Sequence, residues 1–526
     1  MLKDLQSIDP PELSLNTDVV VIGGGIAGLV LATRLARHSV RTIVLESGGA
    51  AHVTAPDPLN AVIQIGQAYN GAAEGRYRGL GGTSQRWGGA MLPFKACDMG
   101  EHTAGWPIDW PVSIDSIERH FAEIEALFRL PAGPFELNDR ATQDGPETKF
   151  VLRSAKWPSF RLRNVANALR KQIAGDGLEI WLNATVTRFF LDARGRLAAV
   201  QAEAPSGKKI TVNCRVAVLA AGAIESTRLM LLLDRQHDSR VFGPRRVLGH
   251  YFFDHLSSPV ATVEPVDRRS LNETFGMRFE RSGMRDVRIE PSASLRRAAQ
   301  LPGAFARISA ASDKGSSFDA LRAIYRNMQS GSPVDWRNVR ALTRDFGWLS
   351  KASYWRFVNG RLLAPRDSVF KLILVTEQFP NEKSTITLDG EHRDRHGNPL
   401  ACINWQTDVK DIESFRALQS ALLDFWDASS LRHLGSLTPV AETIWRPHLQ
   451  ADADIFHPGG TTRMGRDPAG GVVDANLSAF QLPNLYVVST SVFPSGGSAN
   501  PTFTLMAFAL RAAEHIAHQL SGGATT

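Results

Sequence analysis

One histidine and one asparagine near the C-terminal end of the chain stand where they could do acid–base chemistry. His457 opens the run His457-Pro458-Gly459-Gly460-Thr461, and Asn500 precedes Pro501-Thr502. A neutral imidazole is a natural base for a hydroxyl proton near pH 7, and an amide can hold the same oxygen without competing for the proton. Taken alone, His457 would more often be an ordinary loop histidine with its hydrogen bonds satisfied. Asn500 could be a helix N-cap with Pro501 in the first turn, and that helix N-terminus could also face a developing negative charge.

A glycine pattern near the N-terminus predicts a dinucleotide site. Gly23, Gly25 and Gly28 fit G-x-G-x-x-G directly after the apolar run 19–22. The first glycine permits a tight turn, the second lets a pyrophosphate approach the backbone, and the third lets helix pack on strand. Glu46 ends the next apolar run, where a carboxylate can accept hydrogen bonds from ribose hydroxyls. The motif does not decide between FAD and NAD.

A second glycine-rich loop follows at 79–89. Its glycines allow close backbone approach, and the hydroxyls of Thr83 and Ser84 could donate to phosphate. The alternative is a flexible surface loop. Trp87 argues against that alternative, because a flexible linker seldom carries a large apolar ring.

Three strand–helix units must position these residues. The apolar runs 19–22, 216–219 and 485–488 predict buried parallel strands, and the helices that follow them are expected at 29–37, 225–233 and 501–520. A further buried strand is expected at 42–45. Because these units lie far apart in the sequence, they predict one doubly wound core built from separated segments. Between them, a strand is expected at 384–388 and an amphipathic helix at 411–425.

Composition excludes several classes of protein. The 526 residues carry 59 Lys and Arg against 53 Asp and Glu, with no dense basic block, so nucleic-acid binding is not expected. The three cysteines are far apart and predict neither a metal site nor a disulfide framework. No secretory signal is visible, and the charge-free stretch 475–510 is broken by prolines, so we expect buried chain and a cytoplasmic protein. The basic and aromatic segment 315–360 could face a partner or a membrane surface, or form an amphipathic part of a second domain.

Taken together, these segments resemble the glucose–methanol–choline (GMC) family of FAD-dependent oxidoreductases. The stretch 457–502 carries the most specific part of the resemblance. Further matching segments are Gly105-Trp106-Pro107-Ile108, the run 220–226, Asp254-His255 and the run 377–381.

The resemblance implies an α/β fold in two parts. A Rossmann-like FAD-binding domain would be assembled from the discontinuous segments 15–100, 180–260 and 455–520. A substrate-binding domain with an antiparallel sheet and helices would comprise 101–179 and 261–454.

The resemblance also implies roles for individual residues. His457 corresponds to the catalytic base and Asn500 to its partner, Asp474 matches an acidic residue near the flavin pocket, and the strand at Val186 is similar to one whose backbone contacts adenine. Arg86 stands where some pyranose oxidases carry a histidine that tethers FAD, so we expect non-covalent FAD. The full set of predicted cofactor-binding residues is Gly23, Gly25, Ile26, Ala27, Gly28, Glu46, Gly82, Thr83, Ser84, Trp87, Gly88, Gly89, Val186, Ala221, Asp474, Pro501 and Thr502.

The expected activity is oxidation of a hydroxyl group of a sugar, glycoside or polyol to a carbonyl, with hydride transfer to FAD and reoxidation by O₂ or a quinone or other carrier. The alternatives are a GMC-like enzyme acting on a non-sugar alcohol and a non-redox FAD-containing lyase. A scaffold protein should have lost His457 or Asn500, and a flavin monooxygenase would lack the 457–502 block. Membrane association is not expected, an oligomer is possible, and some bacterial relatives are exported with a signal-bearing partner subunit.

Overall fold

The structure is a computed structural model of the 526-residue chain. It describes residues 1–50, 57–100, 108–137, 149–243, 247–311, 317–330, 333–342, 346–365, 368–449 and 456–522. Of the motifs above, Gly105-Trp106-Pro107 lies outside the described residues.

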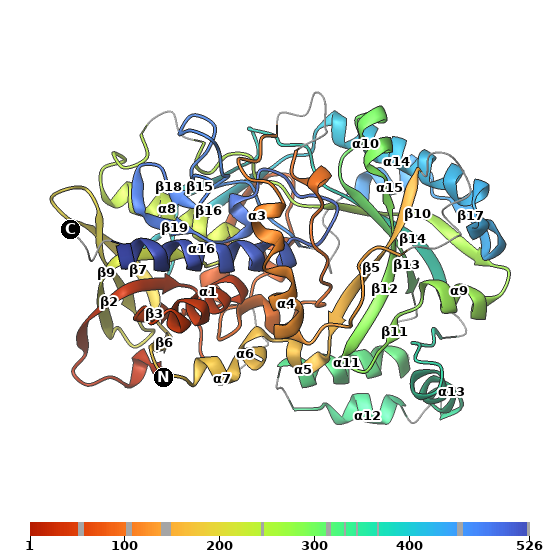
Figure 1. The fold of residues 1–526 in the computed structure, drawn as a ribbon, viewed down its shortest axis with the longest axis horizontal. Helices are drawn as coiled ribbons and strands as arrows, with labels where there is room; N and C mark the ends of the chain where they lie inside the picture. Colours follow the sequence, from red (N-terminus) through yellow and green to blue (C-terminus); the bar gives the residue numbers. More distant parts are fainter. Residues whose placement is uncertain are drawn as a thin grey trace.

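The first sheet holds the three predicted strand–helix units. Its strand order is β1 (Leu2–Asp4), β6 (Leu178–Leu182), β3 (Thr42–Leu45), β2 (Glu12–Ile22), β9 (Lys209–Leu219), β19 (Leu482–Val487) and β18 (Ser478–Ala479). The hairpin of β7 (Thr185–Leu191) and β8 (Leu197–Glu203) continues from β9. Strand β2 pairs in parallel with β3 and β9, and β9 pairs in parallel with β19, which confirms the doubly wound core from separated segments (Figure 1).

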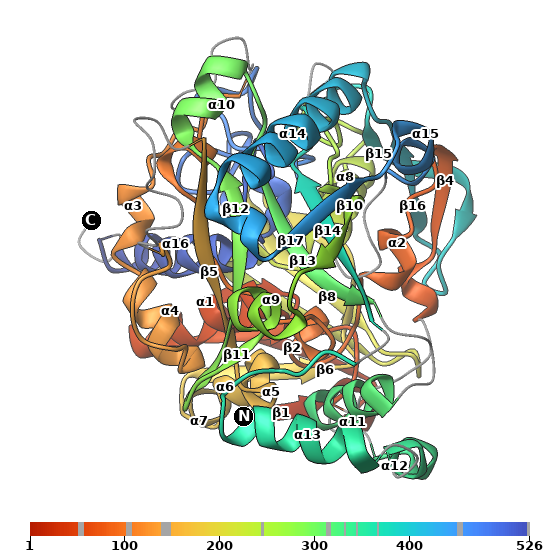
Figure 2. The ribbon, with the colours of Figure 1, turned by 90° about the vertical axis from the view of Figure 1, so that its right-hand side faces the viewer.

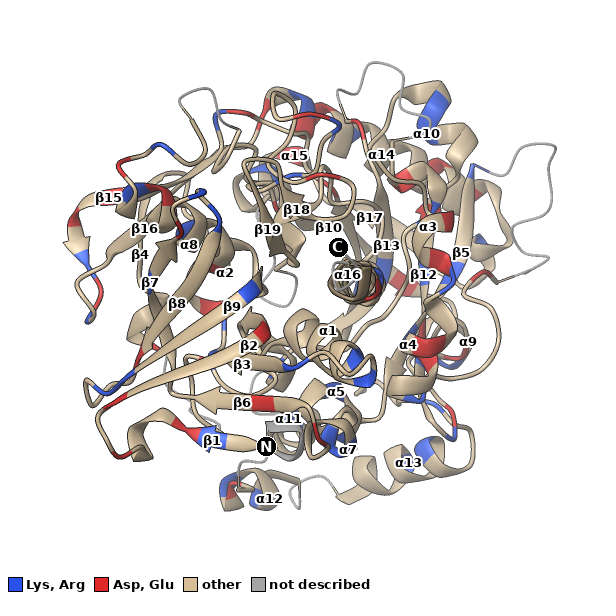
Figure 3. Ribbon diagram, turned by 60° about the vertical axis from the view of Figure 1, so that its left-hand side comes forward, with Lys and Arg blue, Asp and Glu red and all other residues tan. Residues whose placement is uncertain are grey.

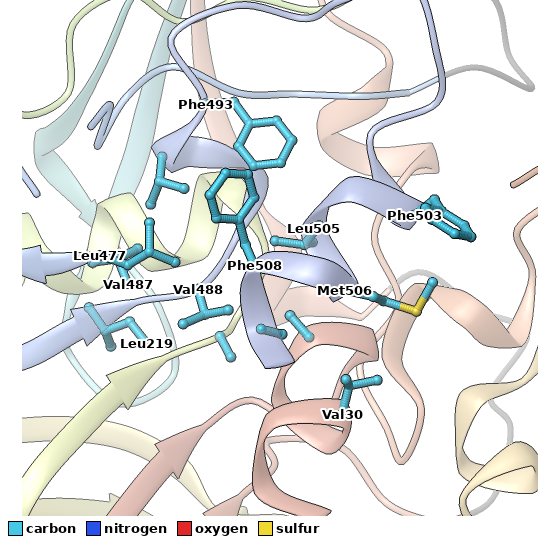
Figure 4. Packing of buried hydrophobic residues seen from close by; sticks show 14 of the residues in the cluster. Val30, Leu219, Leu477, Val487, Val488, Phe493, Phe503, Leu505, Met506 and Phe508 are labelled. Carbon is cyan, nitrogen blue, oxygen red and sulfur yellow. The ribbon is translucent and has the colours of Figure 1, made fainter. Parts of the chain in front are cut away.

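Three long helices pack beside this sheet: α1 (Ile26–Arg37), α8 (Ala223–Gln236) and α16 (Thr502–Gly522). Helix α16 is buried along most of its length, and its Phe508 lies with its ring centre 5.6 Å from that of Phe493 (Figure 4). In the same view Met506 is drawn above Val30 of α1. The stretch 475–510 is therefore buried chain, as expected.

The second sheet is antiparallel and lies on the other side of the molecule (Figures 1 and 2). Its order is β11 (Arg278–Phe279), β12 (Gly283–Pro291), β13 (Ala304–Ala311), β14 (Val369–Thr376), β10 (Leu256–Pro265) and β17 (Gly435–Pro439), with β5 (Phe150–Pro158) also paired to β12. Helix α14 (Val409–Ala428) lies where a helix was predicted. A small third sheet joins β15 (Thr385–Arg393), β16 (Pro399–Trp405) and β4 (Val62–Gly66).

The predicted fold class is confirmed, whereas the division into domains stays a prediction. Two pairings cross the expected boundaries. Strand β4, from the segment assigned to FAD binding, pairs with β16 from the segment assigned to substrate binding. Strand β10 begins inside the segment 180–260 but belongs to the second sheet.

The remaining helices lie mostly at the surface. They are α2 (Gly71–Glu74), α3 (Asp115–Glu118), α4 (Phe121–Phe128), α5 (Phe160–Arg163), α6 (Val165–Ala168), α7 (Arg170–Ile173), α9 (Arg268–Phe275), α10 (Ala293–Ala299), α11 (Ser317–Ser330), α12 (Trp336–Leu342), α13 (Phe346–Phe357) and α15 (Glu442–Trp445). Helices α11 to α13 gather along one edge (Figure 2), and Trp336, Phe346 and Phe357 there are strongly exposed.

Two surface observations bear on partners. No helix among the described residues is long and apolar enough to cross a bilayer. Basic and acidic residues are interspersed along the ribbon (Figure 3). The role of the segment 315–360 stays a prediction.

Candidate active site

A cavity of about 1590 Å³ is lined by both large sheets and by the start of α16. This exceeds the roughly 300–1,000 Å³ of a typical small-ligand pocket, so it has room for a dinucleotide and a substrate together. Every predicted site residue lines it except Gly28, Ser84 and Asp474.

The three motif glycines have three different reasons to lack a side chain. Gly23 has φ +109°, and a Cβ there would lie 2.6 Å from the Ala220 carbonyl oxygen. A Cβ on Gly25 would meet no atom within 4 Å and would project into open space at the cavity wall. A Cβ on Gly28 would collide with the Gly23 carbonyl oxygen. This cradle fits a dinucleotide pyrophosphate, because only the middle glycine leaves room above the backbone.

Glu46 forms hydrogen bonds with the backbone of both glycine-rich loops. Its carboxylate accepts hydrogen bonds from the backbone N–H groups of Gly24 at 2.7 Å, Gly48 at 2.8 Å and Gly79 at 2.9 Å. Burial raises the pKa of Glu46, and the three hydrogen bonds oppose that rise. The sequence motif gave no sign of this bracing role. Contact with a ribose hydroxyl stays a prediction, with Glu46 placed on the cavity wall.

Two predicted cofactor-binding residues, Ser84 and Asp474, do not line the cavity, and their side chains form hydrogen bonds within the protein. Ser84 donates from its hydroxyl to the Gly81 carbonyl at 2.5 Å and accepts from the Val165 N–H at 3.0 Å, so its side chain braces the loop. The Asp474 carboxylate accepts from the N–H groups of Asn476 and Ser478 and closes a turn before β18. Trp87 lines the cavity and donates from Nε1 to the Arg163 carbonyl at 2.8 Å, so the second loop is packed around this ring.

A chain of hydrogen bonds ends on His457. His255 Nε2 lies 2.9 Å from the Gly497 carbonyl oxygen, and the Nδ1 atoms of His255 and His457 lie 3.1 Å apart. A carbonyl only accepts, so a neutral His255 carries its hydrogen on Nε2 and presents a bare Nδ1. His457 must then donate from Nδ1, which leaves its Nε2 unprotonated. This tautomer is inferred from the hydrogen-bond partners.

The side chain of Asn500 lies beside the unprotonated Nε2 of His457. Its Nδ2 lies 2.9 Å from His457 Nε2 and donates to it. Its Oδ1 is buried and has no hydrogen-bond partner among the described residues. Both residues line the cavity, and α16 begins two residues later, at Thr502. An unprotonated imidazole nitrogen, an amide and a helix N-terminus therefore converge on one point, which suits a hydroxyl that loses its proton.

Burial keeps both imidazoles neutral. Desolvation, followed by the charges of His255 and Arg288, lowers the pKa of His457 well below its usual value. Desolvation lowers the pKa of His255 to about 4. His457 is therefore unprotonated and able to accept a proton across the physiological pH range.

Asp254 anchors the backbone of both histidines. Its carboxylate accepts from the N–H groups of His255 and His457, each at 2.6 Å, and from the Tyr69 hydroxyl at 2.5 Å. Burial raises the pKa of Asp254 to about 7, and these hydrogen bonds limit the rise. Potential ligand atoms of Asp254, His255 and His457 lie within 4.8 Å of one another, as in a metal site. The hydrogen bonds account for this arrangement, and the expectation of no metal stays a prediction.

The loop before α16 is held by buried carboxylates. Glu377 accepts from the Gly497 N–H at 2.6 Å, and Asp98 accepts from the Ser498 N–H at 3.0 Å. Arg296 lies 2.6 Å from Asp98 and neutralises it. The Gly497 carbonyl and Asn500 therefore sit on a rigid segment. Asp254, His255 and Glu377 occur in the sequence motifs above, but no spacing rule assigned them these contacts.

Comparisons with known proteins bear on the family and the fold. Residues 18–258 match a family model described as FAD dependent oxidoreductase, and residues 380–509 match one described as GMC oxidoreductase. The chain is 22% identical to 2-methyl-1,2-propanediol dehydrogenase of Mycolicibacterium austroafricanum over 96% of each chain. It is 40% identical to pyranose 2-oxidase of Lyophyllum shimeji over 38% of this chain and 32% of that one. The crystal structure of a pyridoxine 4-oxidase from Mesorbium loti superposes with a TM-score of 0.59, at 18% identity, over 96% of this chain and 99% of that one.

Proposed function

Because the chain belongs to the GMC oxidoreductases and is an FAD-dependent oxidoreductase, we propose that it oxidises a hydroxyl group of a sugar, glycoside or polyol to a carbonyl. The observation that carries this proposal is the unprotonated Nε2 of His457 beside the Asn500 amide on the wall of the large cavity. The names of the relatives, which act on sugars and a diol, support the substrate class.

The residues that would hold FAD form two groups. The backbone at Gly25 and Ile26, at the start of α1, would meet the pyrophosphate, and Glu46 would meet the ribose. The second loop, with Gly82 and Thr83, lies across from Gly25, since a Cβ on Gly82 would lie 2.9 Å from the Gly25 Cα. When bound, FAD supplies the two-electron acceptor for the hydride that leaves the substrate carbon.

The chain's own contribution is proton handling and orientation. His457 would take the hydroxyl proton at Nε2, while His255 holds the opposite ring nitrogen. Asn500 would release its contact with His457 and donate to the substrate oxygen. The helix dipole of α16 would favour negative charge that develops at its N-terminus, near Pro501 and Thr502.

Non-covalent attachment of FAD is part of the proposal. Arg86 lines the cavity, its guanidinium lies 4.4 Å from the centre of the Tyr77 ring, and its Nη1 donates to the Tyr77 hydroxyl at 3.2 Å. A guanidinium engaged in this way is not a nucleophile for the flavin ring.

Anaerobic stopped-flow reduction of the flavin tests the function. Sugars, glycosides, polyols, sterols and simple alcohols would be mixed in turn with the yellow enzyme. We expect sugar-type hydroxyls to bleach the oxidised flavin, and His457→Ala to retain FAD while reduction slows by about 10²–10⁴-fold. Bleaching only by sterols or simple alcohols would refute the substrate class. FAD that no hydroxyl compound reduces would refute hydroxyl oxidation and favour the non-redox alternative.

A further inference from the structure

Helices α12 and α13 carry most of the exposed aromatic rings of the described residues. Five phenylalanine, tryptophan or tyrosine side chains of these residues are exposed, and four of the five lie on the two helices. The four are Trp336 (81% exposed), Phe346 (73%), Tyr354 (58%) and Phe357 (81%), and we call them the α12–α13 aromatic surface. The two helices lie with α11 along one edge of the molecule (Figure 2). A cluster of exposed apolar side chains marks a site of contact with another protein or with a membrane.

Helix α13 is apolar on two sides. Its exposed residues recur at spacings of four, four and three, which places them on one face of a helix; they are Phe346, Ser350, Tyr354 and Phe357. The opposite face packs inward, because Trp348 is buried with its ring edge against Phe318, at 6.1 Å between the ring centres. A helix that is apolar all round is normally covered on all sides. The outer face of α13 therefore has the composition of a covered surface, although the described residues leave it exposed.

The charge around these rings is positive. From 335 to 357 the sequence has five Lys and Arg against two Asp. Neither helix contains an acidic residue, and the exposed charged side chains on the two helices are Arg337, Arg340 and Lys351. Exposed aromatic rings with basic residues around them are typical of helices that lie at the surface of an anionic bilayer.

Helix α11 joins this surface to the cavity. The Ser317 hydroxyl donates to the Ala341 carbonyl of α12 at 3.1 Å, and Phe318 packs against Trp348 of α13. The same helix contributes Phe318 and Tyr325 to the cavity lining. A partner bound to the α12–α13 aromatic surface would therefore lie next to the helix that forms one wall of the cavity.

A second copy of the chain fits this surface poorly. A twofold interface brings the same patch of both subunits together, so the excess of positive charge would face itself. Lysine is also depleted at interfaces between proteins. Anionic lipid headgroups instead supply the negative charge that the two helices lack, and the headgroup boundary accommodates aromatic rings.

We propose that the α12–α13 aromatic surface docks the protein onto the surface of a bilayer that contains anionic lipids. The four rings enter the headgroup boundary, and the basic side chains contact the anionic headgroups. This inference goes beyond the proposed function and does not depend on it. It takes the membrane alternative for the segment 315–360 and departs from the expectation of no membrane association. Docking would hold the α11 wall of the cavity close to the bilayer.

Co-sedimentation of the FAD-loaded full chain with vesicles tests the proposal. One set of vesicles is pure phosphatidylcholine, and the other contains about 30% phosphatidylglycerol. We expect at least about tenfold stronger binding to the anionic vesicles, and loss of most of that binding at about 1 M salt, where charges are screened within about 3 Å. Equal binding to both kinds of vesicle, or binding to neither, would overturn the proposal.

Removal of single rings locates the binding on the α12–α13 aromatic surface. Trp336→Ser and Phe357→Ser should each weaken binding to the anionic vesicles by at least about tenfold, because each deletes one ring from the docking face. Phe190→Ser is the matched control, since Phe190 is the fifth exposed ring and lies on β7 of the first sheet. The control should bind as wild type does. Equal losses in the three variants, with normal FAD content and thermal unfolding, would overturn the proposal.

Removal of single charges tests the attraction to anionic lipid. Arg337→Gln and Lys351→Gln should each weaken binding about fivefold and keep the rings in place, so they also serve if a serine variant fails to fold. Lys410→Gln is the matched control, because Lys410 is exposed on α14. Losses as large in Lys410→Gln, or no loss in either of the other two variants, would overturn the electrostatic contact with lipid.

An environment-sensitive label distinguishes this face from others and lipid from a second copy. A nitrobenzoxadiazole group on Ser350→Cys, between the rings of α13, should shift its emission to the blue on anionic vesicles. The same label on Ser206→Cys, exposed in the turn between β8 and β9, should not shift, and labelled wild type gives the background from the three native cysteines. Vesicle-bound protein without a shift at position 350 would overturn the assignment to this face. A lipid-free dimer that Trp336→Ser dissociates in sedimentation velocity would assign the surface to a second copy and overturn the proposal.

Discussion

Loss of the hydrogen bond between the imidazoles of His255 and His457 is expected to slow the removal of the substrate proton. His255 accepts from His457 Nδ1 and donates to the Gly497 carbonyl. His255→Phe removes both contacts, whereas His255→Asn can still present an amide oxygen near the position of Nδ1. His255 is a positioning residue, since it acts on the substrate only through His457. The Phe variant should therefore slow proton removal, and the Asn variant should recover most of the loss.

The size of the effect follows from the charge that His457 acquires. Before proton transfer, the contact joins two neutral rings and is worth about 0.5–1.5 kcal/mol. Once His457 holds the proton, its Nδ1–H becomes a charged donor and the contact is worth about 1.5–3 kcal/mol. The difference, about 1–2 kcal/mol, corresponds to a roughly 5–30-fold slower reduction in His255→Phe. Loss of the enforced tautomer adds to this, because a freed ring can carry its hydrogen on Nε2.

The assay is anaerobic stopped-flow reduction at several substrate concentrations, in H₂O and D₂O. The limiting rate should fall while substrate affinity stays within about threefold, and the solvent isotope effect should rise because proton transfer becomes slower. His250→Phe is the control, since His250 is outside the cavity lining and contacts the Glu382 carbonyl at an exposed site. Equal rates for the Phe and Asn variants, or a Phe variant within twofold of wild type with normal FAD content, would refute the reasoning.

Three further predictions follow from the site. Glu46→Ala should weaken FAD affinity by about 10–150-fold in a fluorescence titration, with near-normal reduction at saturating FAD; unchanged affinity would mean that Glu46 acts only as a brace. The pKa of Asp254 is raised from 3.8 to about 7, so its contribution to stability is present below pH 4 and is lost as pH rises through 7. In urea unfolding, the difference in free energy of unfolding between wild type and Asp254→Asn should grow by about 2–3 kcal/mol from pH 8 to pH 5, and parallel pH profiles would contradict this. Acid precipitation should release intact FAD, and flavin that stays with the precipitate would contradict non-covalent binding.

The sequence predicted the elements that local patterns determine. Apolar runs placed the C-terminal ends of β2 and β9 and both ends of α1 and α16 within three residues, because a buried parallel strand and the helix after it have distinct periodicities. Strands β2 and β9 each begin seven residues before the predicted strand, since their first halves are not continuously apolar. The positions of His457 and Asn500 on one cavity followed from family resemblance rather than from spacing, and the two residues, 43 positions apart, come together only through the tertiary fold. Their catalytic roles stay predictions.

The bracing contacts could not be predicted from one sequence. Ser84 and Glu46 illustrate the reason, since a hydroxyl or carboxylate near a phosphate-binding loop can face the ligand or the loop itself. The choice depends on which backbone N–H groups the fold leaves without partners. Glu46 accepts from three such groups, and Ser84 is occupied by Gly81 and Val165. The register between β12 and β13, which places Ile289 opposite Ala306, is likewise not specified by the sequence of either strand.

Arg288 and His255 have opposite effects on the proton that His457 accepts. Desolvation and the Arg288 charge keep the ring neutral before reaction, which makes it available as a base but disfavours the proton that it must then hold. The accepting nitrogen of His255 offsets this cost, because it strengthens its contact with Nδ1–H only after the proton arrives.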